Sequence, residues 1–199
     1  MPQITTGHAP TTINTFVDLT INDLAAVAVH IQSLDPADRQ LRFGSGVDAR
    51  STEAAQRIAR SMLQGSNVTT FGMWDAAHER LLVVGCYGPV PQKPGTVETG
   101  TSALPEVRGG MSQRISDWLD PRLVAEGYKR IEWMFYEQNE RVAAIAKKWG
   151  LKVTCYQGEC HAFIDLQPTA NAIKDWLDRL DQLMAAVRNE PPDGAGAKL

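Results

Sequence analysis

The chain has 199 residues, of which 43% are hydrophobic and 22% are charged. This length suits one sizeable core and is short for two full domains. The formal net charge of -3 lacks the basic character of a typical nucleic-acid-binding protein, and no apolar run approaches the roughly 18 to 20 residues of a membrane span. Three cysteines, an odd number, indicate a reducing compartment rather than a disulfide framework. Composition therefore predicts a cytoplasmic single-domain protein with neither nucleic acid nor membrane as a partner.

The first half of the chain predicts strands and helices of ordinary length. In chain order they are a flexible leader (1–12), a strand (13–19), helices at 24–34 and 51–63, and strands at 67–74 and 81–87. Asp35-Pro36 is expected to end the first helix, because proline disfavours helical geometry in the residue before it. Ser51 is a good cap for the second helix. The two later strands, joined by a polar turn, predict an antiparallel hairpin.

The second half predicts one crossover and one further hairpin. Its elements are a strand (96–104), a helix (111–126), a strand (131–135), a helix (139–149), a strand pair (151–156 and 161–166), a C-terminal helix (167–189) and a disordered tail (190–199). Pro121 is expected to kink or break the helix that contains it. Hairpins mixed with a strand-helix-strand crossover predict a mixed α/β fold with a partly antiparallel sheet flanked by helices.

The most informative segment runs from Val97 to Ser112. It reads as a strand, a turn marked by Pro105, the pair Gly109-Gly110 and the start of a helix. Free backbone N–H groups at a helix N-terminus suit a phosphate, glycine lets the backbone approach a ligand closely, and Arg108 adds a cation. Taken alone, the same pattern is equally compatible with an ordinary turn.

Neighbouring motifs extend this segment into a family resemblance. Val97-Glu98 and Leu104-Pro105-Glu106-Val107-Arg108-Gly109 resemble the two ends of the strand that enters the cofactor helix in the GNAT superfamily of N-acetyltransferases. The stretch from Asn139 to Leu151 is similar to that family's Asn-x-x-Ala helix, which ends in Lys-x-Gly-Phe. The resemblance covers residues 13–166 and implies the GNAT fold, with a sheet of about six to seven strands and an extra C-terminal helix.

This resemblance implies that acetyl-CoA is the co-substrate and that no metal is needed. Acetyl-CoA would lie in a V-shaped opening between two strands and would donate its acetyl group to an unidentified amine that attacks directly. The residues implied to contact it are Ala103, Leu104, Val107, Arg108, Gly109, Gly110, Met111, Ser112 and Asn139. Glu98 is the preferred candidate for the base, and Tyr136 is a candidate proton donor.

The chain departs from the family pattern in three places. The short loop and the missing tyrosine favour a second interpretation, and a structural domain that binds no cofactor would follow if Pro121 or the loop closes the cleft. The glycine loop is one residue short, so that Gly110 and Ser112 take its small-residue positions. Ala146 stands where many members carry a tyrosine as general acid, and Pro121 interrupts the cofactor helix. The alternative is a catalytically silent module that binds CoA or a protein partner in a regulatory or structural role.

Other residues suggest chemistry less specifically. Cys155, Cys160 and His161 lie close together, but structural zinc normally takes four ligands and no second pair stands at the usual spacing. A bridge between the two cysteines is geometrically possible, yet the inferred compartment predicts that they stay free. His30 is expected in the core or at its edge. The apolar stripe of the C-terminal helix predicts packing either on the sheet or on a second copy in a homodimer.

Overall fold

The computed structural model describes residues 15–44 and 51–166 of the chain. The predicted leader (1–12), the C-terminal helix (167–189) and the tail (190–199) lie outside these ranges. None of the helices within them is long and apolar enough to cross a membrane.

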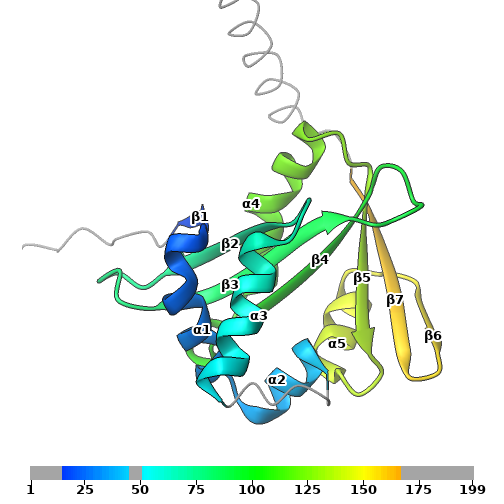
Figure 1. Ribbon diagram of the computed structural model, residues 1–199. Coiled ribbons are helices and arrows are strands. Elements are labelled where there is room, and N and C mark those ends of the chain that lie inside the picture. The colour runs from blue at the N-terminus through cyan, green and yellow to red at the C-terminus, as the bar shows by residue number, and fades with distance from the viewer. Residues whose placement is uncertain (1–14, 45–50, 167–199) are drawn as a thin grey trace, which may run out of the picture.

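A seven-stranded mixed sheet forms the centre of the molecule (Figure 1). Its strands are β1 (Phe16–Asp18), β2 (Thr69–Trp74), β3 (Leu81–Pro89), β4 (Thr96–Ala103), β5 (Arg130–Tyr136), β6 (Val153–Tyr156) and β7 (Glu159–Asp165). Their order in the sheet is β1-β2-β3-β4-β5-β7-β6. The pair β4 and β5 is parallel, and all the other neighbours are antiparallel. The prediction of a mixed, partly antiparallel sheet is confirmed.

Helices cover both faces of the sheet (Figure 1). They are α1 (Leu24–Ser33), α2 (Pro36–Phe43), α3 (Thr52–Gln64), α4 (Met111–Ala125) and α5 (Glu140–Lys148), with single 3-10 turns at Ile21–Asp23 and Pro105–Val107. On one face, α1 and α3 pack against β3 around Val27, Ile31 and Leu81. On the other, α4 packs Leu119 and Leu123 against Phe71, Val97 and Ile131.

The sequence did not predict α2. Asp35-Pro36 does end α1, whose last residue is Ser33, but Pro36 also begins a new helix. Proline suits the first position of a helix, where its missing N–H group has no intrahelical partner to lose. This helix matters because it lies against both β4 and β5.

The expected break at Pro121 is absent. The helix α4 runs through Pro121 as one element from Met111 to Ala125. Leu119 and Leu123 flank the proline and are buried in the same core, 2% and 0% exposed. Their burial on one partner surface stabilises the continuous helix against the loss of one backbone hydrogen bond.

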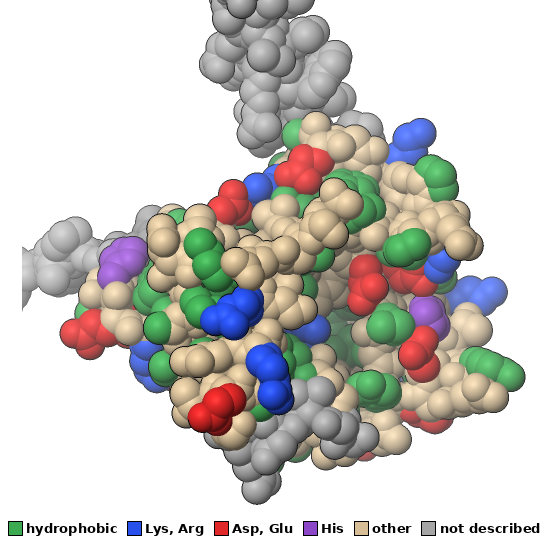
Figure 2. Space-filling model, viewed as in Figure 1, with side chains coloured by type: hydrophobic (Ala, Val, Ile, Leu, Met, Phe, Trp, Pro, Cys, Tyr) green, Lys and Arg blue, Asp and Glu red, His purple; other side chains and the backbone are tan. Residues whose placement is uncertain are grey.

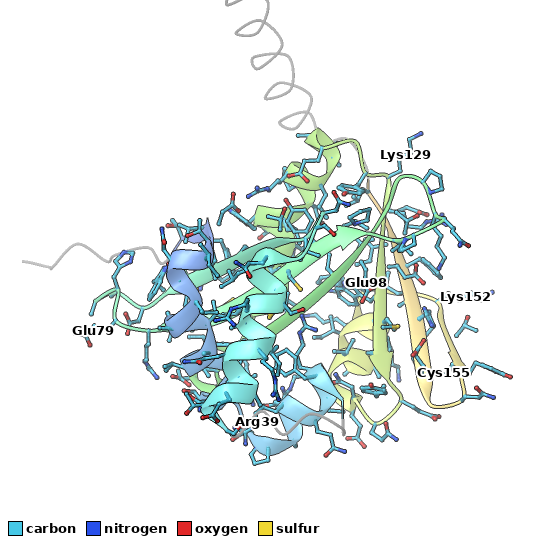
Figure 3. The ribbon with its side chains drawn as sticks, viewed as in Figure 1. Arg39, Glu79, Glu98, Lys129, Lys152 and Cys155 are labelled. Atoms are coloured by element: carbon cyan, nitrogen blue, oxygen red, sulfur yellow. A yellow bond between two sulfur atoms is a disulfide. The ribbon has the colours of Figure 1, made fainter. Side chains whose placement is uncertain are left out.

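The prediction of free cysteines at positions 155 and 160 is wrong, because the structure joins Cys155 to Cys160 in a disulfide (Figure 3). The two residues stand directly opposite each other in the antiparallel pair of β6 and β7. Directly opposed residues bring their side chains together on one face of the sheet. A compartment argument from the number of cysteines contains no information about this register. Cys86 is free.

Candidate functional site

The parallel strands β4 and β5 pair at their beginnings and then part. Their register joins Thr96–Glu98 to Arg130–Glu132 and ends there, although the strands continue to Ala103 and Tyr136. The two ribbons diverge beyond this point (Figure 1). A cleft of about 310 Å³ opens between them, and side chains of α2, α4 and α5 complete its walls.

The edge of β4 that faces the cleft carries backbone groups without a partner strand. Backbone groups of successive residues in an antiparallel strand point alternately to its two sides. The N–H of Leu104 donates to the carbonyl of Leu82 on β3, at 2.9 Å. The groups of Thr99, Thr101 and Ala103 therefore point away from β3, towards the cleft. Of the two residues predicted to offer backbone groups there, Ala103 faces the cleft and Leu104 faces β3.

The glycine turn connects this edge to the start of α4. Gly110 has a φ of 71°, a conformation that glycine adopts without strain, and it stands immediately before the helix. A Cβ atom added at Gly109 or at Gly110 would meet nothing within 4 Å. Within the described ranges, the N–H groups of Gly109, Gly110 and Ser112 make no backbone hydrogen bond. The turn therefore offers an open group of amide donors at a helix N-terminus.

Val107 and Met111 have mainly structural surroundings. The N–H of Val107 donates to the carbonyl of Leu104 at 3.1 Å, and that of Met111 donates to the carbonyl of Arg108 at 3.2 Å. Both side chains belong to the core under α4, and Met111 is 3% exposed. Their contribution to an anion site is to hold the turn in shape.

The Arg108 side chain lies across the end of β4 and is already engaged. Its Nε donates to the carbonyl of Ala103 at 3.1 Å, and its Nη2 pairs with the carboxylate of Asp38. Asp38, on α2, also accepts from Arg141 of α5 at 3.0 Å. One carboxylate thus connects the glycine turn to α5 across the cleft. The sequence predicted the cation at position 108 but not its partner.

Asn139 caps the helix α5. Its Oδ1 accepts a hydrogen bond from the N–H of Val142 at 3.2 Å, as in the standard N-cap arrangement. The residue also lines the cleft. Because the oxygen is used in the cap, the side-chain NH2 group is the part of Asn139 that is left to bind a ligand.

Glu98 stands where β4 and β5 separate, beside the cleft (Figure 3). Its side chain is exposed, and none of the side-chain hydrogen bonds and ion pairs within the described ranges involves it. A carboxylate without such a partner can take up a proton from a ligand without first breaking an interaction. Glu98 lines the cleft, and its role as the base stays a prediction.

Beside Glu98, the next strand carries a carboxylate that the sequence analysis missed. Glu132 pairs with Glu98 in the β4–β5 register and is 4% exposed. It accepts hydrogen bonds from Lys93 Nζ at 2.7 Å and shares a 2.9 Å contact with His161 Nδ1. Burial raises the pKa of the Glu132 carboxyl, but these two hydrogen bonds outweigh burial and the pKa is lowered. Glu132 lies on the same face of the sheet as Glu98, and the alternation of side chains along the two strands is the sequence feature from which this could have been predicted.

His161 connects this buried carboxylate to the surface. Its Nε2 lies 2.9 Å from Glu159 Oε1, and Glu159 lines the cleft. Figure 2 shows acidic side chains, a histidine and lysine or arginine side chains gathered over this part of the sheet. The predicted neighbours of His161, Cys155 and Cys160, are joined to each other and take no part in this chain of polar groups.

Tyr136 ends β5 at the mouth of the cleft, on the same face as Glu132. The two are four positions apart, which corresponds to about 13 Å along a strand. The Tyr136 side chain is 42% exposed, and its hydroxyl lies 3.4 Å from the Cβ position of Gly44 at the end of α2. Because Glu98 lies beside Glu132, Glu98 and Tyr136 line the same cleft at different distances along β5.

Comparison with known proteins identifies the architecture. No family model matches the sequence, and no curated protein matches it. Among solved structures, the GNAT domain of Streptomyces lividans PAT superposes with a TM-score of 0.63 at 11% identity, covering 76% of this chain and 89% of that one. The ribosomal-protein-S5-alanine acetyltransferase from Vibrio fischeri gives a TM-score of 0.60 at 12% identity, covering 76% and 92%. An N-acetyltransferase from Staphylococcus aureus Mu50 gives 0.57 at 15%, covering 77% and 98%. The chain has the GNAT fold that the sequence resemblance predicted.

Proposed function

We propose that this protein is an acetyl-CoA-dependent N-acetyltransferase that moves an acetyl group to an amine by direct attack. One observation carries the proposal: the unpaired edge of β4 leads straight into the open amides of Gly109 and Gly110 at the start of α4. A single extended ligand with amide groups at one end and phosphates at the other fits this sequence of donors and acceptors.

The residues present fit acetyl-CoA in two segments. Backbone groups of Thr99, Thr101 and Ala103 would bind the amides of the pantetheine arm as an added strand does. The N–H groups of Gly109, Gly110 and Ser112 would bind the pyrophosphate, aided by the partial positive charge of the α4 N-terminus. The NH2 group of Asn139 would contact the ligand from α5. Arg108 would neutralise phosphate charge after leaving Asp38.

The acid–base chemistry would come from two residues on one face of the sheet. Glu98 would accept the proton that the amine loses while its nitrogen bonds to the acetyl carbon. Tyr136 would give its phenolic proton to the sulfur while the carbon–sulfur bond breaks, and would regain a proton from solvent. Acetyl-CoA supplies the thioester carbonyl on which this exchange takes place. Each positioned group typically contributes about 100-fold or more in rate.

Binding is tested by a matched pair of substitutions at Gly109. This glycine has open space around its Cβ position and no positive φ, so it tolerates a side chain. We expect acetyl-CoA to raise the thermal midpoint of the native protein. Gly109→Asp should weaken acetyl-CoA about tenfold by placing like charge beside the phosphates, and its isostere Gly109→Asn should weaken it less. A dissociation constant equal in all three proteins would exclude this turn as the phosphate site.

Turnover is tested by thiol release from acetyl-CoA across a panel of amines. Glu98→Gln should lower kcat about 100-fold or more and leave acetyl-CoA binding unchanged, because it removes the base and keeps the size. The engagement of Arg108 by Asp38 and Ala103 favours the alternative function, a silent module that binds CoA or a protein partner. If acetyl-CoA binds but no amine of the panel causes thiol release from it, that result would support the alternative.

A further inference from the structure

Arg42 is pressed against β4 at Gly100. A Cβ atom added at Gly100 would lie 2.5 Å from Nη2, 2.7 Å from Cζ and 2.9 Å from Nη1 of Arg42, so only glycine leaves room for the guanidinium there. Glycine weakens the interior of a strand and often marks a close approach. The chain thus places a cation from α2 directly on the strand that carries Glu98, and both Arg42 and Gly100 line the cleft.

The charge of Arg42 is not compensated by any residue in the described ranges. Its Nη2 lies 3.3 Å from Cys86 Sγ, and its Cζ lies 5.3 Å from the centre of the Phe43 ring. Its Nε is buried and has no hydrogen-bond partner among the residues that the structure describes. Ion pairs with carboxylates are formed by Arg80, Arg108, Arg122, Arg130 and Arg141, among others of the chain's arginines that have partners.

An unpaired guanidinium in a partly buried wall is costly, because part of its hydration is lost without an opposite charge in return. The planar fork of arginine matches the two oxygens of a carboxylate. Among the described residues no carboxylate offsets this cost, and a carboxylate delivered by a ligand would offset it. Cys86 is too weak an acceptor to do so.

The positions of Arg42 and Glu98 determine which charges a ligand bound between them should carry. Glu98 and Gly100 lie on one face of β4, two residues and about 7 Å apart. A molecule bound between them meets a cation at one end and a carboxylate at the other. A short zwitterion, with an ammonium group and a carboxylate close together, carries the two charges that complement Glu98 and Arg42 on this wall of the cleft.

We propose that the acceptor is a free amino acid, whose carboxylate binds Arg42 while its amine faces Glu98. This inference rests on the proposed acetyl transfer, and it adds the substrate class. Arg42 is then a binding and specificity residue rather than a catalytic one. Compounds that carry the amine alone lack the group that Arg42 recognises.

The test measures binding of the twenty common amino acids by ligand-observed NMR, with acetyl-CoA or CoA in the same sample. Each amino acid that binds is compared with its decarboxylated amine and with its carboxamide. The protein variants are Arg42→Gln, Arg42→Lys and the matched control Arg39→Gln. Arg39 is on the same helix and donates to the carbonyl of Gln32, and Figure 3 places it away from Glu98 at the edge of the molecule.

We expect at least one amino acid to bind, and its decarboxylated amine and carboxamide to bind about 10- to 100-fold more weakly. Arg42→Gln should cause a similar loss, Arg42→Lys an intermediate loss because it keeps the charge without the fork, and Arg39→Gln no loss. In turnover, Arg42→Gln should raise the acceptor KM and leave the KM of acetyl-CoA unchanged. If Arg42 had a purely structural role, its substitution would not raise the acceptor KM while leaving the KM of acetyl-CoA unchanged.

The results separate the two proposals. No amino acid bound, equal binding of amino acid and amine, or unchanged binding in Arg42→Gln would overturn the assignment of Arg42. A missing effect of acetyl-CoA on the thermal midpoint would instead refute acetyl transfer, while amino acid binding that depends on Arg42 would still establish the carboxylate site. If Arg42→Gln fails to fold, Arg42→Lys gives the same comparison with the charge retained.

Discussion

Asp38 forms ion pairs with two arginines of the cleft, and these ion pairs determine whether the two guanidinium groups are free to bind an anionic ligand. Its side chain is 15% exposed and accepts from Arg108 on the glycine turn and from Arg141 on α5. Both cations line the cleft where phosphates would bind. A carboxylate that neutralises them competes with an anionic ligand for the same donors.

We therefore predict that Asp38→Asn tightens CoA binding about fivefold, which corresponds to about 1 kcal/mol. The substitution keeps the size of the side chain and frees both guanidinium groups. Asp35→Asn is the control, since the Asp35 side chain is more exposed and, within the described ranges, pairs with Arg108 alone, at 3.5 Å. Isothermal titration of the three proteins at low and moderate salt measures the effect. Weaker binding in Asp38→Asn would mean that Asp38 orients Arg108 for the ligand.

A second residue-scale feature is the buried histidine beneath β4. His30 is 1% exposed and lies between the carbonyl of Leu81 and the hydroxyl of Ser102, 2.9 Å from each. Burial lowers the pKa of His30 from 6.5 to about 4, although the hydrogen bond to Leu81 opposes the shift. The residue is thus neutral in the native state at pH values where the unfolded chain protonates it.

This difference predicts a stability that rises with pH between about 4 and 6.5. In that range the unfolded state binds more protons, so acid favours unfolding. At about 1.4 kcal/mol per pH unit, the contribution of His30 is about 3 kcal/mol across the whole interval. Urea unfolding at several pH values measures it. His30→Gln should be less stable at pH 7 and should show a flatter pH dependence; an equally steep curve would assign the acid sensitivity to other groups.

At the scale of elements, most local predictions followed from spacing and caps. Ser51 accepts from the N–H of Ala54 and begins α3, as its position predicted. The alternation of side chains along β4 puts Glu98, Gly100 and Ser102 on one face, as for any strand. Where elements differed from prediction, packing was the cause: burial on both sides of Pro121 keeps α4 continuous, and α2 is a short helix held between two strands.

Asn139 stabilises a whole element, because it is the N-cap of α5. We predict that Asn139→Ala lowers the free energy of unfolding by about 1 kcal/mol, because it removes the N-cap of α5. Asn139→Asp should keep stability, since aspartate also caps, and Gln138→Ala serves as an exposed neighbouring control. Chemical denaturation without ligand gives the comparison. Equal stability of all four proteins would leave only a ligand-binding role for Asn139.

At the scale of the whole molecule, one sheet has a hydrophobic core on each of its faces, and its two central strands, β4 and β5, part to form the cleft. Aromatic side chains form two clusters: Trp118 lies 5.1 Å from Phe71 and 5.4 Å from Phe16, between ring centres. Trp133 and Trp149 pack together at 5.2 Å next to α5. These clusters hold α4 and α5 on the same face of strands that have parted, so the cleft is stabilised by packing on both of its sides.

The sequence by itself determined the strands and hairpins, most of the helices, the crossover from β4 to β5 and the glycine turn. These features depend on periodicity, caps and backbone preference over a few residues, which are local properties. Together with the motif resemblance, they sufficed for the fold; Glu98 and Asn139 line one cleft, and the turn of Gly109 and Gly110 lies between the cleft residues Arg108 and Met111.

Only the tertiary structure decided how charges meet in that cleft. Asp38 is 70 residues from Arg108 and 103 from Arg141, and no spacing rule relates such positions. The same holds for Arg42 on Gly100, for the chain from Glu132 to His161, and for the pairing of Cys155 with Cys160. Side chains that are distant in sequence become partners only when the sheet register and the helix packing bring them together. For this reason the chain predicts where the cleft is, and the packed molecule determines which of its charges remain available to a ligand.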